Sequence, residues 1–329
     1  MKWENNIQKR IYYYAFFTTL WTWFLVWVGG VVTSMGAGLS VPDWPTSYGY
    51  HMFLLPWEYW IGGAFFEHTH RLVATFAGFF MLSLWILLLI HESRKWVKQL
   101  SLILLVLVIL QGLLGGSRVT MLKDELGIFH GCLAQVYLVL LGFLTLVLSP
   151  YWRSRDRSKS VTTGGDFGPF FKTLTIVIFF QLALGATMRH EHAGLSITDF
   201  PTVYGKVLPD VSPSSMEKIN AQRVDDDLEE TTPTYIMIQF VHRLVAYGLV
   251  VVAVYLIFRR HYFTERLVKW FVLIMAGLIF IQVALGIATI LTQKAADVAT
   301  AHVAIGALIF LLSGLLSALC SRENLDQGT

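Results

Sequence analysis

The sequence predicts an all-α polytopic membrane protein whose eight transmembrane helices form two repeated four-helix bundles. The first observation is composition: 55% of the 329 residues are hydrophobic and the mean hydropathy is +0.58, whereas about 45–50% apolar residues are usual in soluble domains. The second is that apolar runs of about 20 residues, the length that crosses a bilayer as a helix, recur along the chain. The third is an internal repeat that divides these runs into two sets of four.

Eight apolar runs mark the expected spans. They lie near residues 11–35, 66–90, 97–119, 126–149, 170–188, 234–258, 267–291 and 298–320. The first run is too long for the core of a signal peptide, and no small-residue cleavage site follows it, so we expect it to be retained. It also begins too close to Met1 to leave room for an organelle transit peptide, which favours a bacterial inner membrane.

The distribution of Lys and Arg predicts the orientation of these spans, because cytoplasmic loops are enriched in both residues. Lys and Arg gather on one side, at residues 9–10, 94–98, 153–159 and 259–269. On the other side, residues 36–64 contain neither, and residues 190–233 are acidic. Both termini are therefore expected in the cytoplasm. Residues 151–169, which include a stretch rich in Arg, Ser and Gly, are expected to form a flexible cytoplasmic linker.

The N-terminal half, residues 1–150, and the C-terminal half, residues 170–329, share three motifs in the same order. The segment GLSVPDWPTSYG at 38–49 returns as GLSITDFPTVYG at 194–205, and HRLVA at 70–74 returns at 242–246. His130 then matches His302 at the same offset. Because each half holds four spans, we expect both halves to share one orientation and to be related by an axis along the membrane normal.

Four histidines are expected about one turn inside the outer ends of the even-numbered spans. They are His70 and His130 in the first half, and His242 and His302 in the second. A lone histidine in a span is usually a hydrogen-bonded packing residue. Four histidines at matched depth, paired by a repeat, instead favour a shared binding role. Two opposed imidazoles on facing helices suit the two axial positions of a heme iron.

Zinc is the alternative metal, but it normally takes four ligands, or three and a water molecule. Two histidines per half, no cysteine ligand, and a nearby carboxylate in only one half fit zinc poorly. Small residues on these helices would let a flat macrocycle approach closely, although some can equally be helix-packing glycines. These residues are Gly78, Gly112, Gly115, Gly116, Gly131, Gly248, Gly286 and Gly306.

Glu67 is the main difference between the two halves. It lies three residues before His70, on the same helix face, whereas the second copy has the neutral Gln239 in its place. A carboxylate there can act as a base or stabilise developing positive charge. A structural role remains the alternative, either as a helix cap or as an ion pair with Arg71. The asymmetry favours the N-terminal half as the reactive one.

Several other residues give weaker indications of a functional role. Arg71 and Arg243 each follow a histidine directly and are expected either to pair with heme propionates or to reach the membrane surface. His68 points away from His70 and is expected to be solvated or to pack. Arg118 and Arg189, at outer span ends, are weaker candidates for propionate binding. The Asp-Trp-Pro and Asp-Phe-Pro segments predict rigid hairpins that either cover each heme edge or serve only as structural turns.

Together these residues resemble the heme A synthase family over essentially the whole chain. The resemblance is carried by Glu67-x-x-His70-Arg71, His130, His242-Arg243, His302 and the two Gly-Leu-Ser…Asp…Pro loops. It implies an eight-helix, two-half enzyme that converts heme O to heme A for cytochrome oxidase, by hydroxylating a ring methyl successively and losing water. His70 and His130 would border the substrate heme, with Glu67 taking part in the oxidation. His242 and His302 would bind a permanent heme B, so that all four histidines would serve as axial ligands of heme iron.

One departure concerns the outer loops, where many bacterial members of the family carry a cysteine pair. Here the corresponding positions are Val41 with Ser47, and Ile197 with Val203. A thiol–disulfide contribution is therefore absent, which leaves open a relative with a modified substrate. The two cysteines present, Cys132 and Cys320, are expected near opposite ends of their helices, which argues against a disulfide between them.

Two other functions fit part of the pattern. A di-heme membrane cytochrome that transfers electrons, for instance with quinol, explains the four histidines but gives Glu67 no part. A third function, that of a transporter or heme-handling protein, would be compatible with the internal repeat alone. The expected partners of the enzyme are heme O, a heme O synthase, an electron acceptor, the lipid bilayer and a second copy of the chain. No Lys- and Arg-rich run interleaved with aromatics is present, so nucleic acid is not an expected partner.

Overall fold

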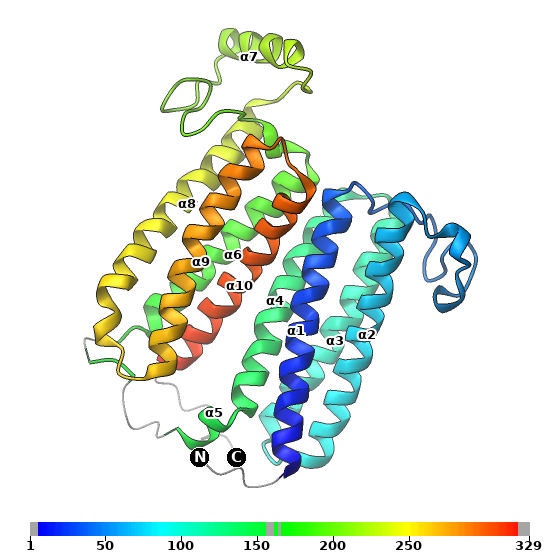
Figure 1. Ribbon diagram of the computed structural model, residues 1–329, viewed down its shortest axis with the longest axis vertical. Coiled ribbons are helices and arrows are strands. Elements are labelled where there is room, and N and C mark those ends of the chain that lie inside the picture. The colour runs from blue at the N-terminus through cyan, green and yellow to red at the C-terminus, as the bar shows by residue number, and fades with distance from the viewer. Residues whose placement is uncertain (1–5, 156–160, 164–165, 322–329) are drawn as a thin grey trace.

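Eight long helices dominate the computed structural model, which describes residues 6–155, 161–163 and 166–321 (Figure 1). Each is long and apolar enough to cross a membrane. They are α1 (Asn6–Ser34), α2 (Gly62–His91), α3 (Lys95–Met121), α4 (Asp124–Leu148), α6 (Gly168–His190), α8 (Pro233–Arg259), α9 (Arg266–Leu291) and α10 (Ala296–Cys320). The predicted fold class of an all-α polytopic membrane protein is therefore confirmed.

The helix ends lie within a few residues of the predicted span ends, and local chemistry explains several of them. Pro233 opens α8, where its missing N–H costs nothing, and the hydroxyl of Thr232 accepts from the backbone N–H of Tyr235. At the other end of a span, α3 stops at Leu122, which takes a left-handed conformation with φ 53°. The apolar runs determine the helices, while caps of this kind determine where they stop.

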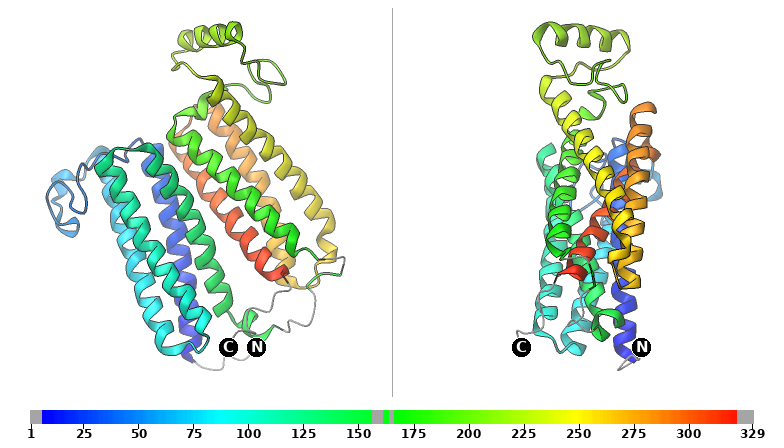
Figure 2. Two further views of the ribbon diagram at one scale, coloured as in Figure 1. Left: turned by 180° about the vertical axis from the view of Figure 1, so that it is seen from behind. Right: turned by 90° about the vertical axis from the view of Figure 1, so that its left-hand side faces the viewer.

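Two groups of helices lie side by side, α1 to α4 in one and α6 with α8 to α10 in the other (Figures 1 and 2). Helices α1 and α4 of the first group pack against α10, and α4 also packs against α6. Gly142 and Gly314 let α4 and α10 approach closely, because Leu311 and Val139 occupy the space that side chains would need. The relation of the two groups by a rotation axis along the membrane normal stays a prediction.

Short elements lie at the two ends of the long helices. They are α5 (Pro150–Ser154), α7 (Pro213–Asp225) and the 3-10 turns η1 (Met52–Leu54), η2 (Trp57–Tyr59), η3 (Ala193–Leu195) and η4 (Arg260–Tyr262). Helix α7 stands beyond the ends of α8 and α9 (Figure 1). We expected only an acidic loop there. Met216 and Ile219 of α7 are buried against the loop that precedes it, so an amphipathic face stabilises this helix.

The described parts of the predicted linker, residues 151–169, are tied to both groups. Arg153 on α5 pairs with Glu92 at 2.9 Å, next to the end of α2. The backbone N–H of Thr264 donates to the carbonyl of Val161 at 2.9 Å, beside the start of α9. Residues 156–160 and 164–165 lie outside the described residues. We call this end of the molecule, where α1 begins and α10 finishes, the linker end, and the opposite end the loop end (Figure 1).

Candidate functional site

The structure brings the four predicted histidines together in two pairs near the loop end. His242 on α8 and His302 on α10 face each other with ring centroids 6.5 Å apart and an interplanar angle of 58°. His70 on α2 and His130 on α4 are electrostatic neighbours in the first group. All four rings lie deep among protein atoms, yet none is completely covered. Each pair therefore lies within its own helix group.

Each imidazole packs against a glycine of the long helix that precedes its own in the chain. A methyl group on that glycine would stand only 3.1–3.4 Å from Cε1 of the ring, closer than almost all real contacts of this kind. The pairs are Gly29–His70, Gly115–His130, Gly185–His242 and Gly286–His302. From the sequence we expected Gly115 and Gly286 to let a macrocycle approach their helices. In the structure each of them lies directly against a histidine. Gly29 and Gly185 were missed.

A glutamine four residues before the glycine holds the histidine in three of the four cases. The backbone carbonyl of Gln282 lies 3.1 Å from Nδ1 of His302, whereas the buried Nδ1 atoms of His70, His130 and His242 have no hydrogen-bond partner. An Nδ1–H that donates to a carbonyl leaves Nε2 free to bind a metal and raises its basicity.

The side chains of two of these glutamines also fix the histidine backbone. Nε2 of Gln111 donates to the carbonyl of His130 at 3.1 Å, and Nε2 of Gln181 to that of His242 at 2.9 Å. On α1 the corresponding residue is Leu25, which has no side-chain donor. A search for Gln-x3-Gly spacing would have found three of the four arrangements from sequence.

The geometry of the second pair fits a metal bound between two imidazoles. Two rings on opposite sides of one ion, each bonded at about 2.0–2.1 Å, have centroids roughly 6 Å apart, close to the 6.5 Å between His242 and His302. Among the described residues, no three His, Cys, Asp or Glu side chains converge on one point. The donor set therefore fits a metal whose other ligands come from a macrocycle, as in heme, better than it fits zinc.

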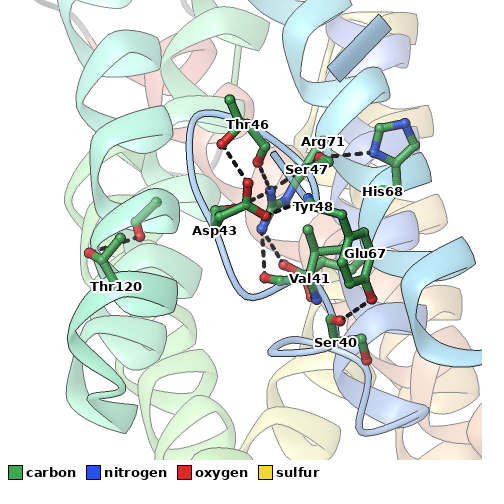
Figure 3. A network of polar contacts seen from close by, with 11 residues as sticks. Ser40, Val41, Asp43, Thr46, Ser47, Tyr48, Glu67, His68, Arg71 and Thr120 are labelled. Carbon is green, nitrogen blue, oxygen red and sulfur yellow. Dashed lines mark hydrogen bonds and ion pairs between the residues drawn. The ribbon is translucent and has the colours of Figure 1, made fainter. Parts of the chain in front are cut away.

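Glu67 is buried, with 4% of its surface exposed, and both carboxylate oxygens have partners (Figure 3). Oε1 pairs with Nη2 of Arg71 at 2.7 Å, and Oε2 accepts from the backbone N–H of Val41 at 2.9 Å. Arg71 in turn donates to the carbonyls of Asp43 and Thr46 at 2.7 and 2.9 Å. The ion pair with Arg71, one of the two interpretations of Glu67, is thus present and holds the first outer loop onto α2.

Gln239 holds the second outer loop in the same way without a charge. Its Oε1 accepts from the backbone N–H of Ile197 at 2.7 Å, and its Nε2 donates to the carbonyl of Ile197 at 3.1 Å. Arg243 donates to the carbonyls of Thr202 and Ile197 at 3.0 and 3.1 Å. An amide therefore suffices to anchor the loop. The negative charge of Glu67 is what the first half has in addition.

Both outer loops form the predicted hairpins, each organised by an aspartate. Asp43 accepts from the hydroxyl of Thr46 and from the backbone N–H groups of Tyr48 and Gly49. Desolvation raises the pKa of Asp43, but these hydrogen bonds outweigh it, and the pKa lies below its ordinary value. The Trp44–Pro45 peptide bond is cis. The ring of Trp44 lies against Gly116 of α3, so this hairpin spans from α2 to α3.

The second hairpin repeats these contacts with Asp199 as the acceptor. Its partners are the hydroxyl of Thr202 and the backbone N–H groups of Tyr204 and Gly205. Desolvation again raises the pKa of Asp199, and the hydrogen bonds again lower it further than that. The Phe200–Pro201 bond is also cis. The turn chemistry predicted from the two Asp-x-Pro segments is therefore confirmed in both loops.

The remaining candidates lie outside the two histidine pairs. His68 is fully buried, with its Nδ1 3.2 Å from the hydroxyl of Ser47 and its ring edge-on to Trp60, so it packs rather than being solvated. Arg189 of α6 donates to the carbonyl of Gly30 at 2.6 Å and thus joins the two helix groups. Arg118 lies beside Gly38 of the first outer loop and Gly127 of α4.

Sequence comparison places these features in a family. The sequence profile of the COX15-CtaA family, described as cytochrome oxidase assembly protein, matches residues 61–313, which include all four histidines and both hairpin anchors. The chain belongs to this family. The match confirms the resemblance drawn from Glu67, the histidines and the two loops.

Relatives within the COX15-CtaA family cover most of the chain. A heme A synthase of Shewanella oneidensis is 24% identical over 89% of this chain and 92% of its own length. A heme A synthase of Alkalihalophilus pseudofirmus is 22% identical over 97% of this chain and 100% of its own. A heme A synthase of Brucella suis is 25% identical over 89% and 86%, respectively. The similarity thus extends over both helix groups.

Proposed function

We propose that this member of the COX15-CtaA family oxidises a ring methyl of heme O to a formyl group, which yields heme A for cytochrome oxidase. The relatives named heme A synthase support this activity. The observation that carries the proposal is the difference between two otherwise matched loop anchors. Glu67 places a buried carboxylate three residues from His70, whereas Gln239 places an amide three residues from His242. Of the two anchors, only the one in the N-terminal half carries a negative charge.

In this proposal the two histidine pairs have different tasks. His70 and His130 bind the substrate, heme O, and His242 with His302 bind a permanent heme B. Heme B, when bound, supplies one-electron transfer. Nδ1 of His302 lies 3.1 Å from the carbonyl of Gln282, whereas the buried Nδ1 atoms of His70, His130 and His242 have no hydrogen-bond partner. Because such a hydrogen bond strengthens a histidine ligand, His302 is the ligand of the four that is held most firmly.

Glu67 acts on the reacting edge of the substrate. Its two oxygens each accept one hydrogen bond, and a carboxylate has about four lone-pair positions. It can therefore stabilise developing positive charge or accept a proton while it still holds Val41 and Arg71. Arg71 and Arg243 act on the hemes through the hairpins that they hold over each site. The Trp44 hairpin covers the loop end of the first group and excludes water from it.

The setting of the reaction follows the charge distribution. We propose a bacterial inner membrane, with the linker end and both termini in the cytoplasm and the heme sites toward the outer face. A heme O synthase supplies the substrate, and an electron acceptor removes the electrons.

Co-expression with a heme O synthase, followed by extraction and chromatography of the pigments, tests the function. The native protein is expected to convert heme O to heme A. Glu67→Gln is expected to abolish heme A while the Soret absorbance of heme B remains, because an amide keeps the loop anchored, as Gln239 does. Glu58→Gln, the same change at an exposed carboxylate of η2, is the matched control and should leave heme A production intact.

Two results would contradict the proposal. If heme O accumulates with the native protein and neither heme A nor a hydroxylated intermediate appears, the protein is not a heme A synthase. If Glu67→Gln converts heme O as well as the native protein does, Glu67 has no catalytic part. Glu67→Ala separates structure from chemistry. It leaves buried Arg71 without a counter-ion, which is expected to cost about 3–5 kcal/mol of stability, whereas Glu67→Gln is expected to cost much less.

A further inference from the structure

The first outer loop contains a segment, residues 50–61, that is mostly apolar and yet exposed. Leu54, Trp57 and Ile61 have 74%, 79% and 71% of their surface exposed. Among Lys, Arg, Asp and Glu, the segment contains only Glu58. Single exposed apolar residues are ordinary, but a run of them that includes aromatic rings indicates an interaction surface. We call residues 50–61 the aromatic segment.

The aromatic segment folds back along α2 instead of standing beyond the end of that helix (Figures 1 and 2). The hydroxyl of Thr75 donates to the sulfur of Met52 at 3.2 Å, and the ring of Phe53 lies edge-on to Phe76 with centroids 6.3 Å apart. Phe76 follows Gly62, the first residue of α2, by 14 residues, which is about 21 Å along the helix. The segment therefore lies against the side of a membrane-spanning helix.

The length of α2 places this contact within the bilayer. From His91, the last residue of α2, a hydrocarbon core of about 30 Å takes up about 20 residues and reaches Arg71. Phe76 then lies about 7 Å inside the core at the loop end. Phe53 and Phe76 are 49% and 43% exposed, so this pair of rings presents an apolar surface at the depth of lipid acyl chains.

The backbone of the aromatic segment suits a place with little water. In η1 the N–H of Leu54 donates to the carbonyl of His51 at 2.8 Å. In η2 the N–H of Trp60 donates to the carbonyl of Trp57 at 3.0 Å. Pro56, which lies between the two turns, has no N–H. Polar backbone groups must be paired within the protein where water is scarce, and the two turns provide such pairs locally.

The composition of the aromatic segment favours a bilayer as its partner. Trp and Tyr are enriched where a protein meets the membrane surface, because their rings are apolar and their N–H or O–H groups are polar. The segment contains Tyr50, Trp57, Tyr59 and Trp60. Residues 36–64 contain neither Lys nor Arg, so the segment offers no such cation to a lipid phosphate. Its contact with lipid must therefore be apolar.

The two hairpins are supported from outside in different ways. Tyr48 of the first hairpin stacks on Tyr59 of η2, with ring centroids 5.1 Å apart. The equivalent Tyr204 of the second hairpin accepts from Arg223 of α7 at 3.1 Å. Helix α7 is mostly polar on its exposed side and stands beyond the ends of α8 and α9 (Figure 1). The second hairpin is thus held by a protein cover, and the first by the aromatic segment.

We propose that the aromatic segment inserts into the bilayer leaflet at the loop end and thereby anchors the first hairpin to the membrane. Phe53 and Leu54 contact acyl chains, and Trp57 and Tyr59 lie at the headgroup boundary. An interfacial element buries its apolar face about 5–10 Å into the leaflet, which agrees with the depth of Phe76. The bilayer thus supports the hairpin that Glu67 holds, and this support requires no heme.

The depth of the segment is measured on the full-length protein in phosphatidylcholine nanodiscs, with a nitrobenzoxadiazole fluorophore on a single cysteine. Cys132→Ala and Cys320→Ala remove the native thiols. Leu54→Cys is compared with Val224→Cys of α7, because the two native side chains are 74% and 59% exposed. The label at position 54 is expected to emit at shorter wavelength. Its ratio of quenching by brominated phosphatidylcholine to quenching by aqueous iodide should be several-fold higher than that at position 224.

Leu54→Arg tests the anchoring. A charged side chain among acyl chains is costly, so exchange of the Tyr48 amide should accelerate at neutral pH, whereas Val224→Arg should leave it unchanged. Monodisperse elution of the nanodiscs shows that each variant is intact. The proposal is overturned if iodide quenches positions 54 and 224 equally, or if Leu54→Arg leaves exchange of Tyr48 unchanged. If neither quencher reaches position 54, protein such as a second copy of the chain covers the segment, and the proposal is again overturned.

Discussion

Each of the four span histidines owes its position to a neighbouring residue without a side chain. Glycine in a membrane helix usually serves close packing between helices. Here Gly29, Gly115, Gly185 and Gly286 each leave room for one imidazole. The ring is thereby held between a glycine on one side and the interior of its helix group on the other, which fixes where Nε2 points. A ligand atom held in this way loses little freedom when it binds.

Gly286→Val tests this role of the glycines. Its side chain would occupy the space beside His302, where even a methyl group would stand 3.2 Å from Cε1. We expect the ring to be displaced and heme B content to fall several-fold, measured by pyridine hemochrome per mole of protein. Gly277→Val is the matched control on the same helix, since no atom lies within 4 Å of a methyl group there. Equal heme content in the two variants would show that the glycine does not position the histidine.

Glu67 shows at the same scale how one position can combine two roles. The structural alternative weighed from the sequence, an ion pair with Arg71, is present. Gln239 performs the anchoring part of that role as a neutral amide. Anchoring therefore does not require the charge, and the carboxylate remains the feature that the proposed chemistry needs.

At the scale of elements, the two hairpins are held by aspartates whose pKa values lie below the ordinary value of 3.8. A carboxyl group whose pKa is lowered by folding stabilises the fold above its ordinary pKa, and this stabilisation is lost as the pH falls through the lower, folded value. Both hairpins should therefore be fully held at neutral pH and should loosen below about pH 4.

Hydrogen exchange corrected for intrinsic pH dependence measures this loosening. Exchange of Tyr48, Gly49, Tyr204 and Gly205 amides, which donate to the two aspartates, should accelerate in acid more than that of helix α9. Asp43→Asn should raise exchange in the first hairpin at neutral pH and remove its acid transition, while the second hairpin keeps its own. Acid-independent protection of Tyr48 in the native protein would contradict the assignment.

The extra helix α7 is another feature at this scale. Arg223 of α7 is buried and donates to the carbonyls of Leu195 and Glu229, both at 2.7 Å. Helix α7 therefore folds as a cover on the second hairpin. The first loop has only the short turns η1 and η2 in the corresponding region.

At the scale of the whole molecule, α1 stands between the two candidate sites. Gly29 contacts His70 on one side, and Gly30 contacts Thr300 of α10, two residues before His302, on the other. The indole of Trp23 donates to the carbonyl of Ala304 at 3.0 Å, and Arg189 donates to that of Gly30. These contacts between the helix groups lie near the histidine pairs, between which the proposed function requires electron transfer.

Gly314→Val tests how much this close approach matters. Val139 of α4 occupies the space that a side chain on α10 would need, so the two groups must move apart. We expect a loss of about 1–3 kcal/mol, typical of overpacking, and a lower midpoint of thermal unfolding in detergent. Gly277→Val, on the lipid-exposed side of α9, should change the midpoint little. Equal midpoints would mean that the groups are not held by close packing at Gly314.

The sequence by itself determined the fold class, the number of spans, the histidines and the hairpins. Apolar runs of bilayer length form helices, because the backbone must satisfy its hydrogen bonds within each span. A repeat identifies equivalent residues without coordinates, which is why His70, His130, His242 and His302 could be found together. Turn chemistry is equally local, so Asp43 and Asp199 were predicted in hairpins.

Only the tertiary structure determined which residues from different elements are in contact. Gly29 is 41 residues from His70 in the chain and follows Leu25 rather than a glutamine, so nothing local marks it as the neighbour of an imidazole. The burial of Glu67 and the contacts of Gln239 with Ile197 both depend on how a loop folds back onto a helix. Periodicity and composition describe one helix or loop at a time. A site is formed by residues from several elements, and the packing of those elements determines which residues meet.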